Sequence, residues 1–187
     1  MPRGMAIRRA EPADALDIAT VYVASWKKAY PGLIPQSFLD QLSPQAQVER
    51  FERTLTSPPC PRSGTFVLSS PQVVGFTNFG PSRDDDVEKS SVGEVMELYV
   101  EPSSWGRGGG AMLLGAAVEA LTTVGCNVAT LWVLGVNARA RLFYEHLGWS
   151  RDGAVKIRDW EAFTARDVRY RLELCPDELC PDEPCPG

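Results

Sequence analysis

The chain has 187 residues, of which 44% are hydrophobic and 23% charged, and its formal net charge is −5. This size and composition are typical of one globular domain with a full hydrophobic core. Such an acidic chain is a poor candidate for binding nucleic acid, and the sequence holds no 18-residue apolar run that could span a membrane. The first ten residues lack the apolar stretch of a signal peptide, so we expect a cytoplasmic protein.

Periodicity and turn residues predict the elements of the N-terminal half. They are a strand over 7–9, a helix over 13–29, a short helical turn over 33–42, a helix over 44–55, and a hairpin of strands over 65–70 and 73–79. Ser43 followed by Pro44 indicates an N-cap with proline in the first helical turn. The segment 81–91 is polar and acidic, and it either attracts a cationic substrate or forms a solvated loop.

The C-terminal half continues with alternating strands and helices. The predicted order is a strand over 92–100, a helix over 107–124, a strand over 127–134, a helix over 137–147, and strands over 149–157 and 165–174. We therefore expect a single α/β domain with α+β character over residues 1–174. Its mixed central sheet should be flanked by helices on both faces.

Residues 175–187 are rich in cysteine and proline, and they contain Cys175, Cys180 and Cys185. We expect this tail to be disordered. The spacing of its cysteines does not match the usual zinc pairs, and we predict no metal. His146 is the only histidine, so a site with two histidine ligands cannot be built.

The most informative segment runs from residue 94 to 114, where a strand and a turn lead into a glycine cluster and then an apolar helix. This order gathers backbone N–H groups at a helix N-terminus, which is a site that binds phosphate. The triplet that ends a P-loop is absent. The run from Gly106 to Ala111 satisfies the dinucleotide pattern G-x-G-x-x-G/A, but the following strand, 131–136, ends without the acidic residue that binds ribose.

The arrangement resembles the GNAT superfamily of acetyl-CoA-dependent N-acetyltransferases. The family's pyrophosphate loop, Gln/Arg-x-x-Gly-x-Gly/Ala, aligns with residues 105–110, although Trp105 replaces the usual Gln or Arg. A second family motif appears in Asn137, Tyr144 and the run 147–149. The resemblance covers about residues 5 to 174 and implies transfer of an acetyl group from acetyl-CoA to a primary amine.

The resemblance also implies which residues bind acetyl-CoA, the cosubstrate. The pyrophosphate should lie on backbone N–H groups of the loop, and the pantetheine should lie along the preceding strand, where a backbone N–H can also polarise the thioester carbonyl. Asn137 either reaches the cofactor or only caps its helix. The implied cofactor-binding residues are Leu98, Tyr99, Val100, Gly106, Arg107, Gly108, Gly109, Gly110, Ala111, Asn137 and Tyr144.

Tyr144 is the expected general acid that protonates the CoA thiolate, because its phenol is protonated at neutral pH. Glu94 is the candidate base, since it matches a catalytic glutamate of some family members. Glu97 is the alternative base, and a chain of water molecules is the third option. Because Glu94 and Glu97 are three residues apart on one strand, we expect them to point to opposite faces of the sheet.

The acceptor amine, a small molecule or a peptide, is not identified by the sequence. Trp26, Tyr30 and Leu33 are expected to line its pocket, together with the loop 81–91 and the last two strands near Trp160 and Phe163. The alternative is a non-catalytic module that binds or senses acyl-CoA on the same fold. Many family members form pairs, so a homodimer stays open.

Overall fold

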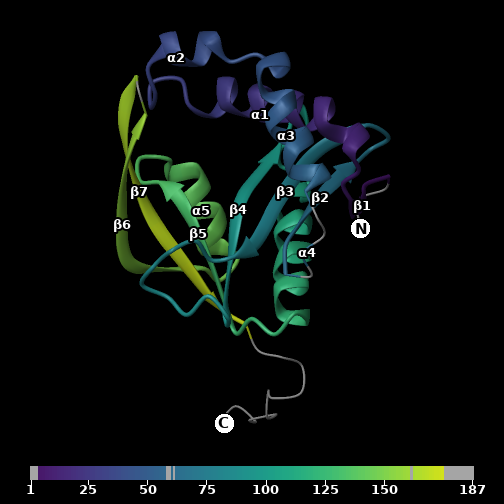
Figure 1. Cartoon of the computed structure of the whole chain (residues 1–187). Helices are drawn as coiled ribbons and strands as arrows, with labels where there is room; N and C mark the ends of the chain where they lie inside the picture. Colours follow the sequence, from purple (N-terminus) through teal and green to yellow (C-terminus); the bar gives the residue numbers. More distant parts are fainter. Residues whose placement is uncertain (1–3, 58–59, 61, 161, 175–187) are drawn as a thin grey trace, which may run out of the picture.

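The computed structural model describes residues 4–57, 60, 62–160 and 162–174. One sheet has its seven strands in the order β1-β2-β3-β4-β5-β7-β6 (Figure 1). The strands are β1 (Ala6–Arg9), β2 (Gly64–Ser69), β3 (Val73–Pro81), β4 (Val92–Val100), β5 (Val128–Leu134), β6 (Ser150–Trp160) and β7 (Phe163–Glu173). Only β4 and β5 pair in parallel, and the other neighbours are antiparallel. The predicted mixed sheet is confirmed.

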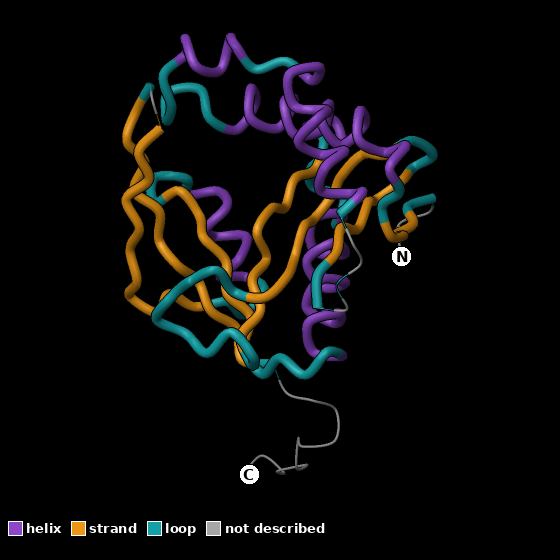
Figure 2. Tube along the Cα trace, viewed as in Figure 1, coloured by secondary structure: helices purple, strands orange, loops and turns teal. Residues whose placement is uncertain are grey.

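Helices cover both faces of the sheet, as predicted (Figure 2). They are α1 (Ala15–Ala29), α2 (Gln36–Gln41), α3 (Pro44–Thr56), α4 (Gly109–Thr123) and α5 (Ala138–His146). On one face α1 and α3 bury Tyr22 and Phe51 against Phe76 of β3. On the other face Leu114 and Ala117 of α4 pack with residues of β4, β5, α5 and β7. No helix within the described residues is long and apolar enough to cross a membrane.

Local sequence signals fix several helix ends. The side chain of Ser43 accepts a hydrogen bond from the Ala46 N–H at 3.3 Å, which confirms the predicted cap of α3. Asn137 caps α5 in the same way through the Ala140 N–H, at 3.1 Å. Gly148 follows α5 with a φ of +84°, a left-handed conformation that glycine adopts without steric cost. The tail cysteines and their predicted disorder lie outside the described residues.

β4 and β5 are hydrogen-bonded only over a short stretch, from Val92 to Val95 and from Val128 to Leu131. Beyond that point the two strands separate. A β-bulge in β4 coincides with the separation, because Asn78 of β3 pairs with Glu97 while the next residue, Phe79, pairs with Val95. Met96 is therefore the extra residue. A bulge of this kind bends its strand and shifts the alternation of its side chains.

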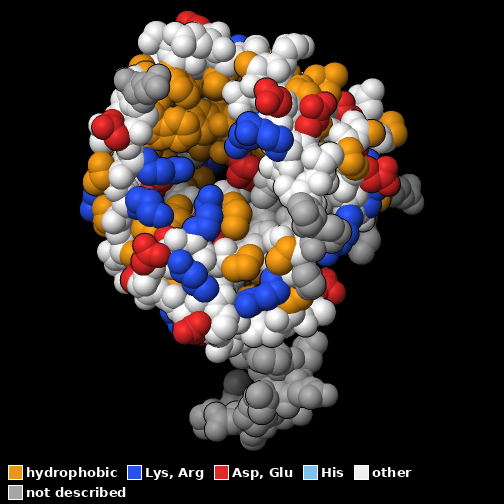
Figure 3. All heavy atoms as spheres, viewed as in Figure 1, with side chains coloured by type: hydrophobic (Ala, Val, Ile, Leu, Met, Phe, Trp, Pro, Cys, Tyr) orange, Lys and Arg blue, Asp and Glu red, His pale blue; other side chains and the backbone are white. Residues whose placement is uncertain are grey.

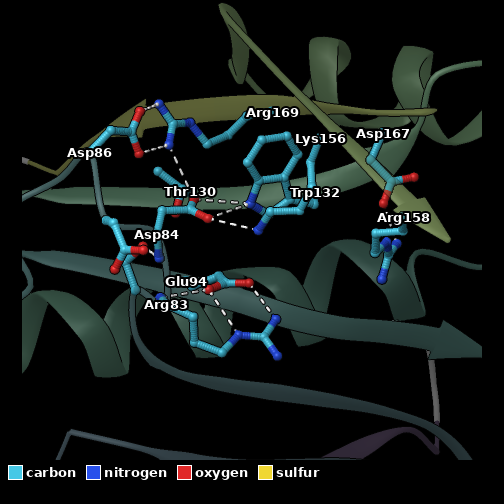
Figure 4. A network of polar contacts seen from close by, with 12 residues as sticks. Arg83, Asp84, Asp86, Glu94, Thr130, Trp132, Lys156, Arg158, Asp167 and Arg169 are labelled. Carbon is cyan, nitrogen blue, oxygen red and sulfur yellow. Dashed lines mark hydrogen bonds and ion pairs between the residues drawn. The ribbon is translucent and has the colours of Figure 1, made fainter. Parts of the chain in front are cut away.

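The loop between β3 and β4 folds back onto the sheet, held by a buried arginine (Figure 4). The side chain of Arg169, on β7, is 8% exposed. Its guanidinium binds Asp86 through two hydrogen bonds of 2.7 Å, Asp84 at 3.1 Å and Asp152 at 2.6 Å. Two carboxylates of the acidic segment are thus paired with Arg169. This part of the segment's negative charge has a structural role.

Asp84 is the most buried carboxylate of this loop, with 5% of its surface exposed. Burial by itself would raise the pKa of Asp84, but hydrogen bonds from Lys156, Arg169 and Trp132 outweigh it and hold the pKa below its usual range. The expectation of a solvated loop is therefore wrong for Asp84. It is a structural anion whose charge is compensated by cations from β6 and β7.

We predict that Arg169→Ala lowers the free energy of unfolding by about 3 to 5 kcal/mol. The buried carboxylate of Asp84 would keep only Lys156 as its cation, and Asp86 and Asp152 would lose their hydrogen bonds to the guanidinium. Urea denaturation followed by circular dichroism measures this change. The matched control is Arg171→Ala on the same strand, whose partner Glu173 has a 69% exposed side chain; exposed pairs of this kind contribute about 0 to 1 kcal/mol. Equal losses in the two variants would contradict the assigned role of Arg169.

Candidate active site

A cleft follows the gap between the separated ends of β4 and β5. It is lined from one side by β4 and the loop before α4, and from the other by β5 and α5. Its volume of about 1620 Å³ exceeds the roughly 300–1,000 Å³ typical of a pocket for one small ligand. The cleft can therefore hold two reactants at once.

The glycine loop forms one end of the cleft. Gly106 and Gly108 have φ values of +77° and +83°, which a residue with a Cβ adopts only with strain. The predicted helix start at Arg107 is wrong by two residues, since α4 begins at Gly109. Arg107 is exposed beside the loop. The first N–H groups of α4, at Gly109, Gly110 and Ala111, have no acceptor within the helix and no side-chain cap among the described residues, so they can bind an anion.

Gly109 and Gly110 are needed for a different reason, which is close packing. A Cβ at Gly109 would lie 2.5 Å from a methyl group of Leu68, and one at Gly110 would lie 3.3 Å from the ring of Phe143. Gly109 stands where many family members carry a larger residue. In this chain it lets the start of α4 sit directly on β2.

Trp105, the departure from the family motif, has two partners. Its indole N–H donates to the Val100 carbonyl at 2.6 Å. The guanidinium carbon of Arg139, in the first turn of α5, lies 3.8 Å from the centre of its ring. Trp105 thus links the end of β4 to α5 on the other side of the cleft through a cation–π contact.

The edge of β4 presents backbone groups to the gap. The Glu101 N–H donates to the Val74 carbonyl at 2.8 Å, so by the alternation of an antiparallel ladder Tyr99 also pairs with β3. The N–H groups of Leu98 and Val100 therefore point away from β3, toward β5. The Val100 carbonyl is already bound by Trp105 and by Ser25 of α1, at 3.0 Å.

Tyr144 and Asn137 both lie on the β5 and α5 side of the cleft. Burial, followed by the proximity of Tyr30, raises the pKa of the Tyr144 hydroxyl well above its usual value. Tyr144 is therefore protonated at neutral pH, and no described residue forms a hydrogen bond with its hydroxyl. Its ring packs against Phe143, with ring centres 5.3 Å apart.

The expected placement of the two glutamates on opposite faces is wrong, and the bulge at Met96 is the reason. Val95 packs in the cluster beneath α4, so Glu94 faces the other side of the sheet. Beyond the bulge, Glu97 contacts Arg50 of α3 at 3.0 Å and also hydrogen-bonds Asn78, which places it on that same side. The extra residue shifts the alternation of side chains by one position, so Glu97 lies on the same face of the sheet as Glu94.

The two glutamates differ in access to the cleft. Glu94 is 1% exposed and accepts three hydrogen bonds from Arg83, of 2.5, 3.0 and 3.2 Å. Glu97 keeps 17% of its side chain exposed and lines the cleft. Of the two candidate bases, Glu97 is the one that a substrate can reach.

Aromatic side chains form the far part of the cleft, and Trp26 and Tyr30 are among its lining residues. The Trp26 indole N–H donates to the Tyr99 hydroxyl at 3.0 Å, and its ring centre lies 4.8 Å from that of Tyr30. Trp160 and Phe163 also line the cleft, and their rings stack with an interplanar angle of 7°. Leu33 is 39% exposed and is not among the lining residues, so its predicted place is wrong.

Arg139 and Asp167 are among the lining residues that the sequence does not single out. Arg139 lies in the helix that Asn137 caps. The sequence around it does not reveal its contact with Trp105, which lies on the other side of the cleft. Asp167 is fully buried and lines the cleft from β7. Asp167 falls in the polar phase of this strand, together with Arg169 and Arg171, so the sequence pattern predicts an exposed side chain and gives no signal of its burial.

Comparison with known proteins identifies relatives over most of the chain. Residues 23–149 match the model of the "Acetyltransferase (GNAT) family". An uncharacterised N-acetyltransferase of Bacillus subtilis strain 168, YuaI, is 30% identical over 142 residues, which are 74% of this chain and 76% of YuaI. Another uncharacterised N-acetyltransferase, from Archaeoglobus fulgidus, is 34% identical over 141 residues, which are 75% of this chain and 89% of that protein.

The fold is also similar to solved structures. One is yncA from Salmonella typhimurium, which was solved with its cofactor acetyl-CoA. The similarity has a TM-score of 0.66 at 21% identity and covers 96% of this chain and 99% of yncA. At this identity the likeness shows the shared fold.

We predict opposite effects for two alanine substitutions in this region. Gly108→Ala forces a positive φ on a residue with a Cβ and should destabilise the fold by about 1 to 2 kcal/mol. Gly115→Ala, at an exposed site of α4 where a Cβ meets nothing within 4 Å, should stabilise it by about 0.5 to 1 kcal/mol. Urea unfolding of both variants tests the loop geometry, and a stabilised Gly108→Ala protein would show that the geometry is wrong.

Proposed function

The chain belongs to the GNAT acetyltransferase family, and on this basis we propose that it transfers the acetyl group of acetyl-CoA to a primary amine within a ternary complex. Membership of the family makes it an acyltransferase. The observation that carries the proposal is the open edge of β4 beside the uncapped N-terminus of α4. A thioester and a pyrophosphate can be bound there by backbone groups of one continuous stretch of chain.

The residues of the cleft fit acetyl-CoA. The free N–H groups at Gly109, Gly110 and Ala111 suit the pyrophosphate, and the helix dipole of α4 adds to their attraction. The N–H groups of Leu98 and Val100 suit the amide of the pantetheine and the carbonyl of the thioester, where the latter contact stabilises the oxyanion of the attacked carbonyl. Arg107 and Arg139 place positive charge beside these groups.

Tyr144 is proposed as the donor to the departing thiolate. Its raised pKa keeps the proton on the phenol in the resting enzyme. A free thiol has a pKa of about 8.5, and burial in the same cleft raises the pKa of the thiolate's conjugate acid as well. Because burial raises both pKa values in the same direction, the raised pKa of Tyr144 does not by itself prevent proton transfer to the thiolate at the end of the reaction.

Glu97 is the proposed base, in preference to Glu94. An alkylammonium has a pKa of about 10 and must lose a proton before it can attack. Glu97 lines the cleft, whereas Glu94 is enclosed by Arg83. A carboxylate at the cleft wall can accept the proton directly or through one water molecule.

We predict that Tyr144→Phe reduces kcat by about 100-fold, the typical loss when a general acid is removed. The assay is release of CoA from acetyl-CoA with a panel of polyamines, aminoglycosides, amino acids, arylalkylamines and short peptides. Acetyl-CoA should still raise the melting temperature of the variant, which controls for folding and cofactor binding. Unchanged kcat would remove Tyr144 as the acid, and tight binding of acetyl-CoA without turnover of any amine would favour a sensing module.

We predict that Glu97→Gln lowers kcat/KM by about 10- to 100-fold. It should lower the melting temperature less than Glu94→Gln does, because the ion pair of Glu97 with Arg50 is more exposed than the buried carboxylate of Glu94. Glu94→Gln should chiefly lower the melting temperature, because it removes the buried partner of Arg83. A large kinetic loss in a stable Glu94→Gln protein, with Glu97→Gln fully active, would reverse the assignment.

Localisation in the cytoplasm, the absence of a metal and a homodimer remain predictions.

A further inference from the structure

The acceptor end of the cleft is a hollow walled by flat rings. Figure 3 shows hydrophobic side chains gathered in this depression, with Lys and Arg side chains at its rim. Among its lining residues are Trp26, Tyr30, Trp160 and Phe163. The ring centres of Trp26 and Trp160 are 5.8 Å apart at an interplanar angle of 64°, and Phe163 stacks on Trp160. Such a surface favours contact with a planar or apolar group.

Asp167 is the unusual feature of this hollow. Its side chain is fully buried, it lines the cleft, and neither carboxylate oxygen makes a hydrogen bond with any described residue. Burying a carboxylate without hydrogen bonds is strongly unfavourable. An unsatisfied buried group of this kind needs a physical explanation, and a bound ligand is one.

One cation touches Asp167, and it is poorly fixed. The Arg158 guanidinium forms an ion pair with Asp167, and 47% of the Arg158 side chain is exposed. Figure 4 shows the two residues apart from the network around Asp84. Because Arg158 extends from the solvent side, it can move toward solvent when another cation takes its place beside the carboxylate.

The neighbourhood of Asp167 connects it to the reacting end of the cleft. Burial raises the pKa of the Tyr30 hydroxyl, interaction with Asn137 lowers it, and the charges of Asp167 and Arg158 act on it in opposite directions. The backbone gives the geometry: Asp167 pairs with Leu134 of β5, and the Asn137 N–H donates to the Leu134 carbonyl at 2.8 Å. Asp167 is therefore one strand away from the turn that carries Asn137, a proposed cofactor contact. An ammonium bound at Asp167 is close to the cofactor side of the cleft.

The other cleft arginines of this region already face carboxylates. Arg50 pairs with Glu97, and Arg83 pairs with Glu94. Asp167 is also matched in charge, by Arg158, but it differs from Glu94 and Glu97 because neither of its oxygens makes a hydrogen bond with a described residue and its one cation is 47% exposed. The charge pattern therefore favours an acceptor that brings N–H donors and a positive charge to Asp167.

We propose that Asp167 binds the ammonium group of the acceptor, and that the acceptor is a primary amine carried on an aromatic or similarly flat apolar group. The ring lies against Trp26, Trp160 and Phe163, and the ammonium replaces Arg158 at Asp167. This inference rests on the proposed acetyltransferase function and names the substrate class of that same site.

Binding is tested on the whole chain with CoA present, so that no turnover occurs. Calorimetry compares 2-phenylethylamine with butylamine, which lacks the ring, and with 3-phenylpropionate, which lacks the ammonium. We expect 2-phenylethylamine to bind at least about tenfold more tightly than either, and Asp167→Asn to remove about tenfold of that affinity or more. The matched control, Asp159→Asn at an exposed position of β6, should bind as the wild type does.

Three results would overturn the proposal. They are equal binding of 2-phenylethylamine and butylamine, tighter binding of the carboxylate, or unchanged affinity in Asp167→Asn. If Asp167→Asn does not fold, Trp160→Leu decides the question, because it should abolish the preference for the ring while CoA still binds. Failure of the wild type to bind acetyl-CoA would instead count against the proposed acetyltransferase function. Turnover of amines that lack a flat group would leave that function in place and count only against the proposed acceptor class.

Discussion

β4 and β5 hydrogen-bond side by side over only four residues each, and the parting of the two strands determines the positions of the functional groups. Beyond that point, β4 and β5 each have one edge that is not hydrogen-bonded to a neighbouring strand. On β4 this leaves the N–H groups of Leu98 and Val100 turned toward the gap, and on β5 it brings the chain to Asn137 and the start of α5. A continuous sheet would use these backbone groups internally, and no cleft would form between α4 and α5.

Keeping a split sheet rigid requires other contacts, and charged side chains supply several of them. Arg169 gathers three carboxylates and holds the β3–β4 loop on the face of β5 and β7. Trp105 and Arg139 contact each other across the cleft. Ser25 and Trp26 attach α1 to the end of β4 through hydrogen bonds. The walls of the cleft are thereby fixed by contacts between elements that are distant in the sequence.

Most of the fold could be predicted from the sequence because the signals are local. Ser43-Pro44, Asn137 and Gly148 mark helix ends by hydrogen bonding and backbone conformation, and the strand boundaries follow hydrophobic alternation. The predicted start of α4 is two residues early because a run composed mostly of glycine carries no clear helix boundary, and the left-handed conformation of Gly108 sets the boundary at Gly109. The loop carrying Asp84 was misjudged because its partners, Lys156 and Arg169, are remote in sequence.

The sequence predicts the half of the candidate site that would bind the cofactor, but it does not predict the half that would bind the acceptor. Backbone contacts at the glycine loop depend on one segment, so the sequence located them. The placement of Glu97 depends on a bulge that only pairing with β3 reveals. The burial of Asp167 is not predictable from the sequence because it arises where β7 lies between β5 and β6 in the sheet.

The bulge at Met96 also has a meaning for the way this family of sequences can change. Side chains alternate along a strand with a period of two, so losing the single codon for Met96 would remove the bulge and leave Glu97 two positions after Glu94, on the same face of the sheet. Tyr99 would keep its face, and Leu98 and Val100 would still face α4. The length of β4 can therefore change by one residue at this position without changing which side chains face the cleft, whereas the loss of a residue beyond the bulge would turn over every residue that follows it.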